Sequence, residues 1–130
     1  MDALKQRIND CQALAAALCR ALRDEAAKLG FNAAAVPTPD PAAAVHRLER
    51  DKVSGSTTLV AEWQDRHGYR IGMLLIHGDG SFFAEYDIAK PHPAKPRMFV
   101  EAVEAWGRDG DIRCEARLMP MVDDVEPAAG

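Results

Sequence analysis

The chain has 130 residues, of which 48% are hydrophobic and 28% charged, and it carries a formal net charge of −4. This length suits a single domain, and the composition is that of a folded globular protein. The acidic balance argues against nucleic acid or an anionic membrane surface as a partner. No apolar run approaches the ~20 residues of a membrane span, and the N-terminus lacks a signal-peptide pattern, so we expect a cytoplasmic protein.

The three cysteines, Cys11, Cys19 and Cys114, cannot all pair with one another. Cys11 and Cys19 fall in one predicted helix, about 12 Å apart at ~1.5 Å per residue, which is beyond the reach of a disulfide. The sequence also lacks a CxxC pair and any cysteine and histidine spacing typical of a zinc site. We therefore expect reduced cysteines, no metal and no cofactor.

Asp2 is placed to cap a helix that runs to about Leu29 and ends at Gly30. The apolar residues of this segment recur at alternating spacings that keep them on one helix face. They are Leu4, Ile8, Cys11, Ala15, Leu18, Leu22, Ala26 and Leu29. We expect this face to lie across a sheet. The alternative is that so long a helix also pairs with its copy in a dimer.

Residues 31–44 include closely spaced prolines and read as an extended linker within the domain. Residues 41–51 are ambiguous between helix and strand. Asp40 followed by Pro41 is a good start for a helix, whereas the residues up to 64 are rich in turn formers and β-branched side chains. We favour strands over residues 41–51 and 57–64, separated by a loop.

Residues 70–88 are predicted to form a β-hairpin about Asp79 and Gly80. An Asp-Gly pair between apolar runs favours a two-residue type I′ turn, which places His77 opposite Phe82. Alternation along the two strands then gives the hairpin a core face. Its residues are Ile71, Met73, Leu75, His77, Phe82, Ala84, Tyr86 and Ile88.

The opposite face of the hairpin carries Leu74, Ile76 and Phe83, where a solvated antiparallel sheet should be polar. These three residues are the predicted interface, covered either by a helix of the chain or by a partner. For Trp63 of the preceding strand to lie beside the core face, the connection that follows Gln64 must have three or five residues.

The segment after the hairpin is rich in proline, and Pro96 suits the first position of a second helix. This helix is predicted to run through Trp106 and to end at Gly107. Phe99, Ala102, Val103 and Trp106 would form its apolar stripe.

Residues 112–119 alternate between apolar and mostly charged side chains and are predicted to form a half-buried strand that ends at Pro120. The acidic tail, 121–130, is expected to be disordered. The predicted fold is α+β, with a long N-terminal helix, an antiparallel meander of three or four strands, a second helix and a final strand. These elements would form a two-layer sandwich in one domain, residues 1–120.

Six residues are candidates for ligand binding: His77, Tyr86, Lys90, His92, Lys95 and Arg97. His77 beside Tyr86 suggests acid-base chemistry, but no further acidic group points to the same face, so we predict no catalytic residue. The four residues from Lys90 to Arg97 gather positive charge at the start of the predicted second helix, where the helix dipole favours a phosphate or carboxylate. We favour a structural interpretation for both groups, as a strand end and a solvated loop.

In size, acidity and order of elements the chain resembles small bacterial secretion chaperones, which place an N-terminal helix before a twisted antiparallel sheet and dimerise to hold an extended partner. It departs from them in ending on a strand and tail, without a final helix. We expect a non-enzymatic, cytosolic protein-binding or adaptor domain that forms a homodimer. The alternative is a small-ligand-binding domain or enzyme with a cavity between the sheet and the helices.

Overall fold

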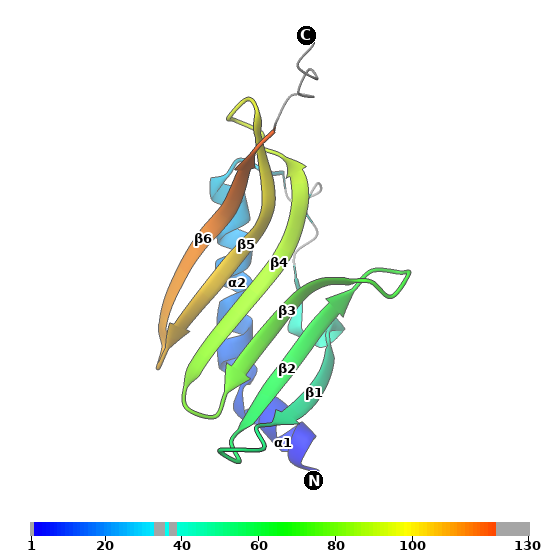
Figure 1. Cartoon of the computed structure of the whole chain (residues 1–130), viewed down its shortest axis with the longest axis vertical. Coiled ribbons are helices and arrows are strands. Elements are labelled where there is room, and N and C mark those ends of the chain that lie inside the picture. The colour runs from blue at the N-terminus through cyan, green and yellow to red at the C-terminus, as the bar shows by residue number, and fades with distance from the viewer. Residues whose placement is uncertain (1, 33–35, 37–38, 122–130) are drawn as a thin grey trace.

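One layer of helices covers one face of a six-stranded antiparallel sheet in the computed structural model of the chain (Figure 1). The structure describes residues 2–32, 36 and 39–121. The helices are α1 (Ala3–Asp10) and α2 (Gln12–Lys28), and η1 is a short 3₁₀ helix (Pro41–Ala43). The strands are β1 (Val45–Arg50), β2 (Thr57–Gln64), β3 (Arg70–His77), β4 (Ser81–Pro91), β5 (Met98–Arg108) and β6 (Asp111–Pro120).

The predicted α+β class is therefore confirmed, whereas the predicted sheet is too small. Each strand pairs with the next in sequence, in the order β1 to β6. Part of the predicted linker, 33–35 and 37–38, lies outside the described residues, as does the predicted disordered tail from residue 122 onward.

The N-terminal helix begins and ends where the sequence predicts, but it is divided at Cys11. The Asp2 carboxylate accepts a hydrogen bond from the Lys5 backbone N–H at 2.8 Å. Gly30 follows the last turn with φ at +102°, a left-handed conformation that a residue with a side chain rarely adopts. The residues of α2 that lie against the sheet are Ala15, Leu18, Cys19, Leu22 and Ala26. Cys19 is among them, and burial raises the pKa of its thiol to about 11.

The ambiguous segment 41–51 contains both of the structures that its sequence suggested. The Asp40 side chain caps η1 by accepting the Ala42 backbone N–H at 3.0 Å. The chain then extends into β1, where Leu48 lies opposite Leu59 of β2. The preferred interpretation as a strand is confirmed from Val45 onward.

The predicted second helix is wrong, because its residues form β5. A β-bulge explains the error. Val100 lies opposite Leu118 and Ala102 opposite Arg117, so Glu101 is an extra residue on β5. The bulge lets Val100 and Val103 both pack into the core although they are three positions apart. Because of the bulge, the apolar residues of this segment do not alternate as in a regular strand, and Phe99, Ala102, Val103 and Trp106 fit the spacing of a helix instead.

The predicted register of the β3–β4 hairpin is wrong by one residue. Ile76, not His77, lies opposite Phe82. The turn has three residues rather than two, and Gly80 has a positive φ, +92°, while Asp79 does not. This is a type I turn followed by a glycine bulge, closed by a hydrogen bond from Gly80 N–H to His77 O at 3.2 Å. The extra residue moves every β4 side chain to the other face relative to β3.

The helix-facing side of the sheet is therefore built differently from the predicted core face. Leu74 and Ile76 share this side with Phe82, Ala84 and Tyr86. The connection between β2 and β3 has five residues, one of the predicted lengths, but a bulge after Trp63 shifts the register again. Trp63 consequently lies opposite Gly72, on the helix side.

The turn residue Asp79 provides a test of the hairpin geometry. Its carboxylate accepts hydrogen bonds from the Ser81 hydroxyl at 2.6 Å and the Ser81 backbone N–H at 2.9 Å. The hydroxyl bond is the largest cause that lowers the pKa of Asp79 to about 2. A lowered pKa stabilises the fold above the ordinary aspartate pKa, and this contribution is lost as the pH falls toward 2. The substitution Ser81→Ala should raise the pKa of Asp79 toward its ordinary value, as measured by an NMR titration. An unchanged pKa would contradict the turn geometry described here.

Candidate functional site

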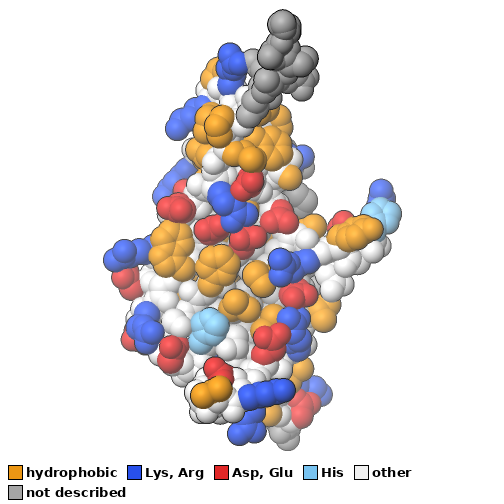
Figure 2. Space-filling view, viewed as in Figure 1, with side chains coloured by type: hydrophobic (Ala, Val, Ile, Leu, Met, Phe, Trp, Pro, Cys, Tyr) orange, Lys and Arg blue, Asp and Glu red, His pale blue; other side chains and the backbone are white. Residues whose placement is uncertain are grey.

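The face of the sheet that the helices leave uncovered carries a row of large apolar side chains. Leu75 of β3 lies opposite Phe83 of β4, and Phe83 lies opposite Trp106 of β5. All three side chains are half-buried. On the other side of Leu75, Val60 of β2 continues the row and is only 1% exposed. Figure 2 shows hydrophobic side chains across the middle of this face, between acidic and basic ones. We call Leu75, Phe83 and Trp106 the outer apolar row.

A row of carboxylates runs beside the outer apolar row. It holds Glu62 of β2, Glu85 of β4, Glu104 of β5 and Glu115 of β6, with Met73 of β3 among them. We call the four glutamates the acidic row. They share a face with the apolar row because residues two apart in a strand point the same way.

Two arginines offset part of the charge of the acidic row. Arg117 lies 3.2 Å from Glu85 and 2.6 Å from Glu101, and it also binds Glu104. Arg47 lies 3.0 Å from Glu62. Nearby, burial raises the pKa of Asp87, and the charge of Glu85 adds to the rise, while Arg117 and Arg70 oppose it.

The structure separates two predicted ligand residues, His77 and Tyr86. His77 is on the outer face, where its Nδ1 lies 2.9 Å from the Thr58 hydroxyl. Tyr86 is 6% exposed beneath the helices and packs edge-on against Trp63, with ring centroids 6.0 Å apart. Burial raises the pKa of Tyr86. The two side chains therefore share no site.

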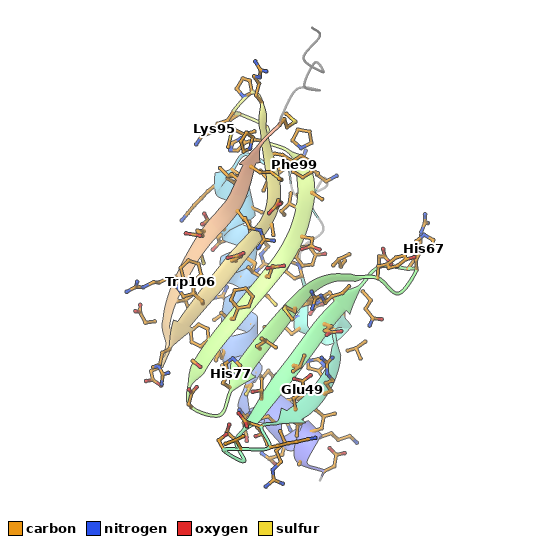
Figure 3. All side chains as sticks on the ribbon, in the orientation of Figure 1. Glu49, His67, His77, Lys95, Phe99 and Trp106 are labelled. Atoms are coloured by element: carbon orange, nitrogen blue, oxygen red, sulfur yellow. The ribbon has the colours of Figure 1, made fainter. Side chains whose placement is uncertain are left out.

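The other four predicted ligand residues lie at the connection between β4 and β5. His92 Nδ1 accepts the backbone N–H groups of Ala94 and Lys95, each at 3.0 Å, which orders the connection. Because β5 is a strand, no helix begins after this loop. The helix dipole on which the predicted anion site depended is therefore missing, and Lys90, Lys95 and Arg97 are exposed around the loop (Figure 3).

The predicted interface is divided between the two faces of the sheet. Leu74 and Ile76 are 1% and 4% exposed and lie in the core under the helices. Phe83 is on the uncovered face, whereas the sequence left open whether a helix or a partner covers its side of the sheet. Its true neighbours, Leu75 and Trp106, were not predicted. The predicted hairpin register places Leu75 in the core, and the predicted second helix places Trp106 in its apolar stripe. An interpretation of residues 98–108 as a strand would have identified Trp106 as a candidate for the uncovered face.

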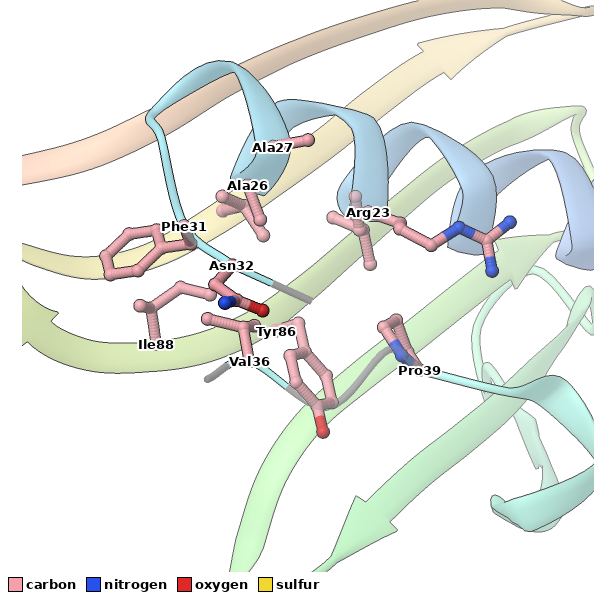
Figure 4. Close-up of a pocket in the computed structure, with 11 residues that line it drawn as sticks. Arg23, Ala26, Ala27, Phe31, Asn32, Val36, Pro39, Tyr86 and Ile88 are labelled. Atoms are coloured by element: carbon pink, nitrogen blue, oxygen red, sulfur yellow. The ribbon is translucent and has the colours of Figure 1, made fainter. Parts of the chain in front are cut away.

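A small cavity lies between the end of α2 and β4 (Figure 4). Its volume is about 90 Å³, room for about three water molecules at ~30 Å³ each. Its lining includes Leu22, Phe31, Ile88 and Val103, and Arg23 is its only charged residue in the part of the chain that is described. A second hollow, about 220 Å³, lies by α1 and η1 and is lined in part by Trp63 and His46. Neither gathers the acid, base and nucleophile that a reaction needs.

Among residues 2–32, 36 and 39–121, no three His, Cys, Asp or Glu side chains are grouped to hold a metal ion. None of the described helices combines the length and apolarity required to cross a membrane. Comparison with known proteins found no match to a family model, to a curated protein or to a solved structure.

Proposed function

We propose that the protein is a non-enzymatic, cytosolic protein-binding domain that binds a basic segment of its partner on the uncovered sheet face. The observation that carries this proposal is the outer apolar row, Leu75, Phe83 and Trp106, which lies half-exposed beside four glutamates. The sheet face of a monomer that needs no partner would be polar in these positions.

The side chains of the apolar row suit an interface. Aromatic residues are enriched at the centres of protein interfaces, where they supply large contact area at low cost in conformational entropy. Phe83 and Trp106 are adjacent across β4 and β5, and Leu75 extends their surface to β3. Together they offer a continuous strip for one or two apolar side chains of a partner.

The charges beside the strip favour a basic partner. The acidic row would attract lysine or arginine side chains that flank an apolar anchor. A second copy laid face to face would instead bring one acidic row close to another, which is unfavourable. We therefore expect the partner on this face to be a different protein, with a segment that combines positive charge and large apolar side chains.

The proposal can be tested with two synthetic peptides of about ten residues. Both contain one Phe and one Leu, and all remaining positions are Lys in the first peptide and Glu in the second. Trp106 is half-exposed on this face, while Trp63 is 4% exposed in the core, so a bound peptide should change Trp106 fluorescence. We expect the Lys peptide to bind, the Glu peptide not to bind, and added salt to weaken binding.

A matched pair of variants locates the binding surface. Phe83→Ser should weaken binding of the Lys peptide at least tenfold, because it removes the centre of the row. Tyr69→Ser should leave it unchanged, since Tyr69 is equally aromatic but 72% exposed in the β2–β3 connection. Equal binding of both peptides, or unaltered affinity in Phe83→Ser, would contradict the proposal.

The alternative of a small-ligand site rests on the apolar cavity between α2 and β4. Its largely apolar lining favours a small uncharged molecule over a charged one. The outer face is the stronger candidate, since it offers both apolar contact and charge to a partner.

A further inference from the structure

The strand β6 ends the sheet, and no described element pairs with its outer edge (Figure 1). It has ten residues, whereas β1 at the other edge has six. An edge strand of this length presents unpaired backbone N–H and C=O groups to another strand. We propose that β6 pairs antiparallel with β6 of a second copy, with Cys114 opposite Cys114 on the twofold axis. This inference does not depend on the proposed partner of the outer face.

Symmetry restricts the register of such a pair. Residues directly opposite in an antiparallel ladder point to the same face of the sheet. The twofold axis must therefore pass midway between one residue and the same residue of the copy, which lie directly opposite each other. Near the middle of β6 the choices are an axis at Cys114, at Glu115 or at Ala116.

Charge decides among these three registers. An axis at Glu115 places Glu115 against its copy and Arg113 against Arg117, so each of these charged pairs repels. An axis at Cys114 places Arg113 opposite Glu115 on both sides of the axis, so both pairs attract. An axis at Ala116 places Glu115 opposite Arg117.

The ion pairs within one copy favour the axis at Cys114. Arg117 is already bound by Glu85, Glu101 and Glu104, so the axis at Ala116 would compete with these contacts. Arg113 and Glu115 are exposed, and neither forms an ion pair with any described residue of its own chain. The axis at Cys114 satisfies both.

The helix side of the edge also leaves room for a second copy. A shallow groove of about 350 Å³ separates α2 from β6, and Ala17, Ala21, Ile112 and Cys114 line its apolar part. Ile112 and Cys114 are only half-buried in the single chain, so pairing would cover both. The other lining residues, Arg20, Asp24, Glu25 and Lys28, carry both signs of charge, so a copy meets no uniform repulsion.

The dimer would join two sheets edge to edge. Because the twofold axis is perpendicular to the joined sheet, both outer apolar rows would lie on the same side of it. A partner with two basic segments could then bind both copies at once, which raises its apparent affinity through effective concentration.

A charge exchange tests the register. Wild-type protein should be dimeric by sedimentation equilibrium at tens of micromolar, and Arg113→Glu or Glu115→Arg should each weaken the dimer at least tenfold. The double variant Arg113→Glu/Glu115→Arg should restore it, since the attracting pairs return with exchanged signs. A monomeric wild type at several hundred micromolar would overturn the proposal. Restoration by Glu115→Arg/Arg117→Glu and not by the first pair would also overturn it, in favour of the axis at Ala116.

Cross-linking provides an independent readout. Diamide, which takes two electrons and two protons from a pair of thiols, should join two chains through Cys114, at alkaline pH because burial raises the pKa of this thiol. The link should form in a Cys11→Ser/Cys19→Ser variant and be lost in Cys114→Ser. A link that persists without Cys114 would contradict the proposed axis. Phe83→Ser should leave the dimer intact, so failure of the peptide experiment and failure of the dimer are distinguishable.

Discussion

A lysine in place of Leu74 is expected to unfold the domain. Leu74 is 1% exposed beneath the helices and lies opposite Ala61 on β2 and Ala84 on β4. No buried carboxylate is available to pair with a lysine there, since the buried residues of the described chain include no polar or charged one. Burying an unpaired ammonium group costs several kcal/mol, a large part of the ~5–15 kcal/mol that stabilises a typical domain.

The adjacent substitution, Leu75→Lys, serves as the matched control. Leu75 lies on the uncovered face, where the new ammonium group can reach water and the acidic row. We expect it to retain the fold, with a cooperative thermal transition by circular dichroism, while Leu74→Lys loses it. If the two variants lost stability equally, or if only Leu75→Lys unfolded, the register of the β3–β4 hairpin described above would be wrong.

This pair of residues also shows where sequence reasoning failed. The hairpin itself was predictable, because a Gly-Asp-Gly run between two apolar segments is a strong turn signal. Its register was not. The same run accommodates a two-residue turn or a three-residue turn with a glycine bulge, and the two differ by one residue. Because residues 73–76 are all apolar, the alternation of side chains could not decide which of them face the helix.

The first half of the fold was more accessible than the second for a physical reason. The N-terminal helix has local signals at both ends, the Asp2 cap and the left-handed Gly30, and these act within a few residues. In β5, the bulge at Glu101 is stabilised by pairing with β6, a partner that sequence periodicity does not reveal. One of the three residues of the outer apolar row, Trp106, lies on this strand. The candidate site was therefore only partly predictable: Phe83 was placed opposite the core face, and Trp106 was not.

A second large effect is expected at Gly72, in the middle of β3. Trp63 and Tyr86 lie opposite it on either side, and their rings meet edge-on at 79° over the space that its missing side chain leaves. A Cβ atom at position 72 would lie 2.8 Å from Tyr86 Cδ1 and 2.9 Å from the Glu85 carbonyl oxygen. Contacts this short force the backbone or the rings to move, so Gly72→Val should cost on the order of 1–3 kcal/mol or more.

Two further variants separate the causes of this loss. Met73→Val places the same side chain one residue along β3, on the uncovered face, and should change the free energy of unfolding by about 1 kcal/mol or less in urea denaturation. Tyr86→Leu in the Gly72→Val background should recover only part of the loss, because the Glu85 carbonyl belongs to the backbone and remains in place. Full recovery would show that the ring alone excludes a side chain at position 72. If the Gly72→Val variant were as stable as wild type, Gly72 could not lie between the two rings. The register described for β2, β3 and β4 would then be wrong.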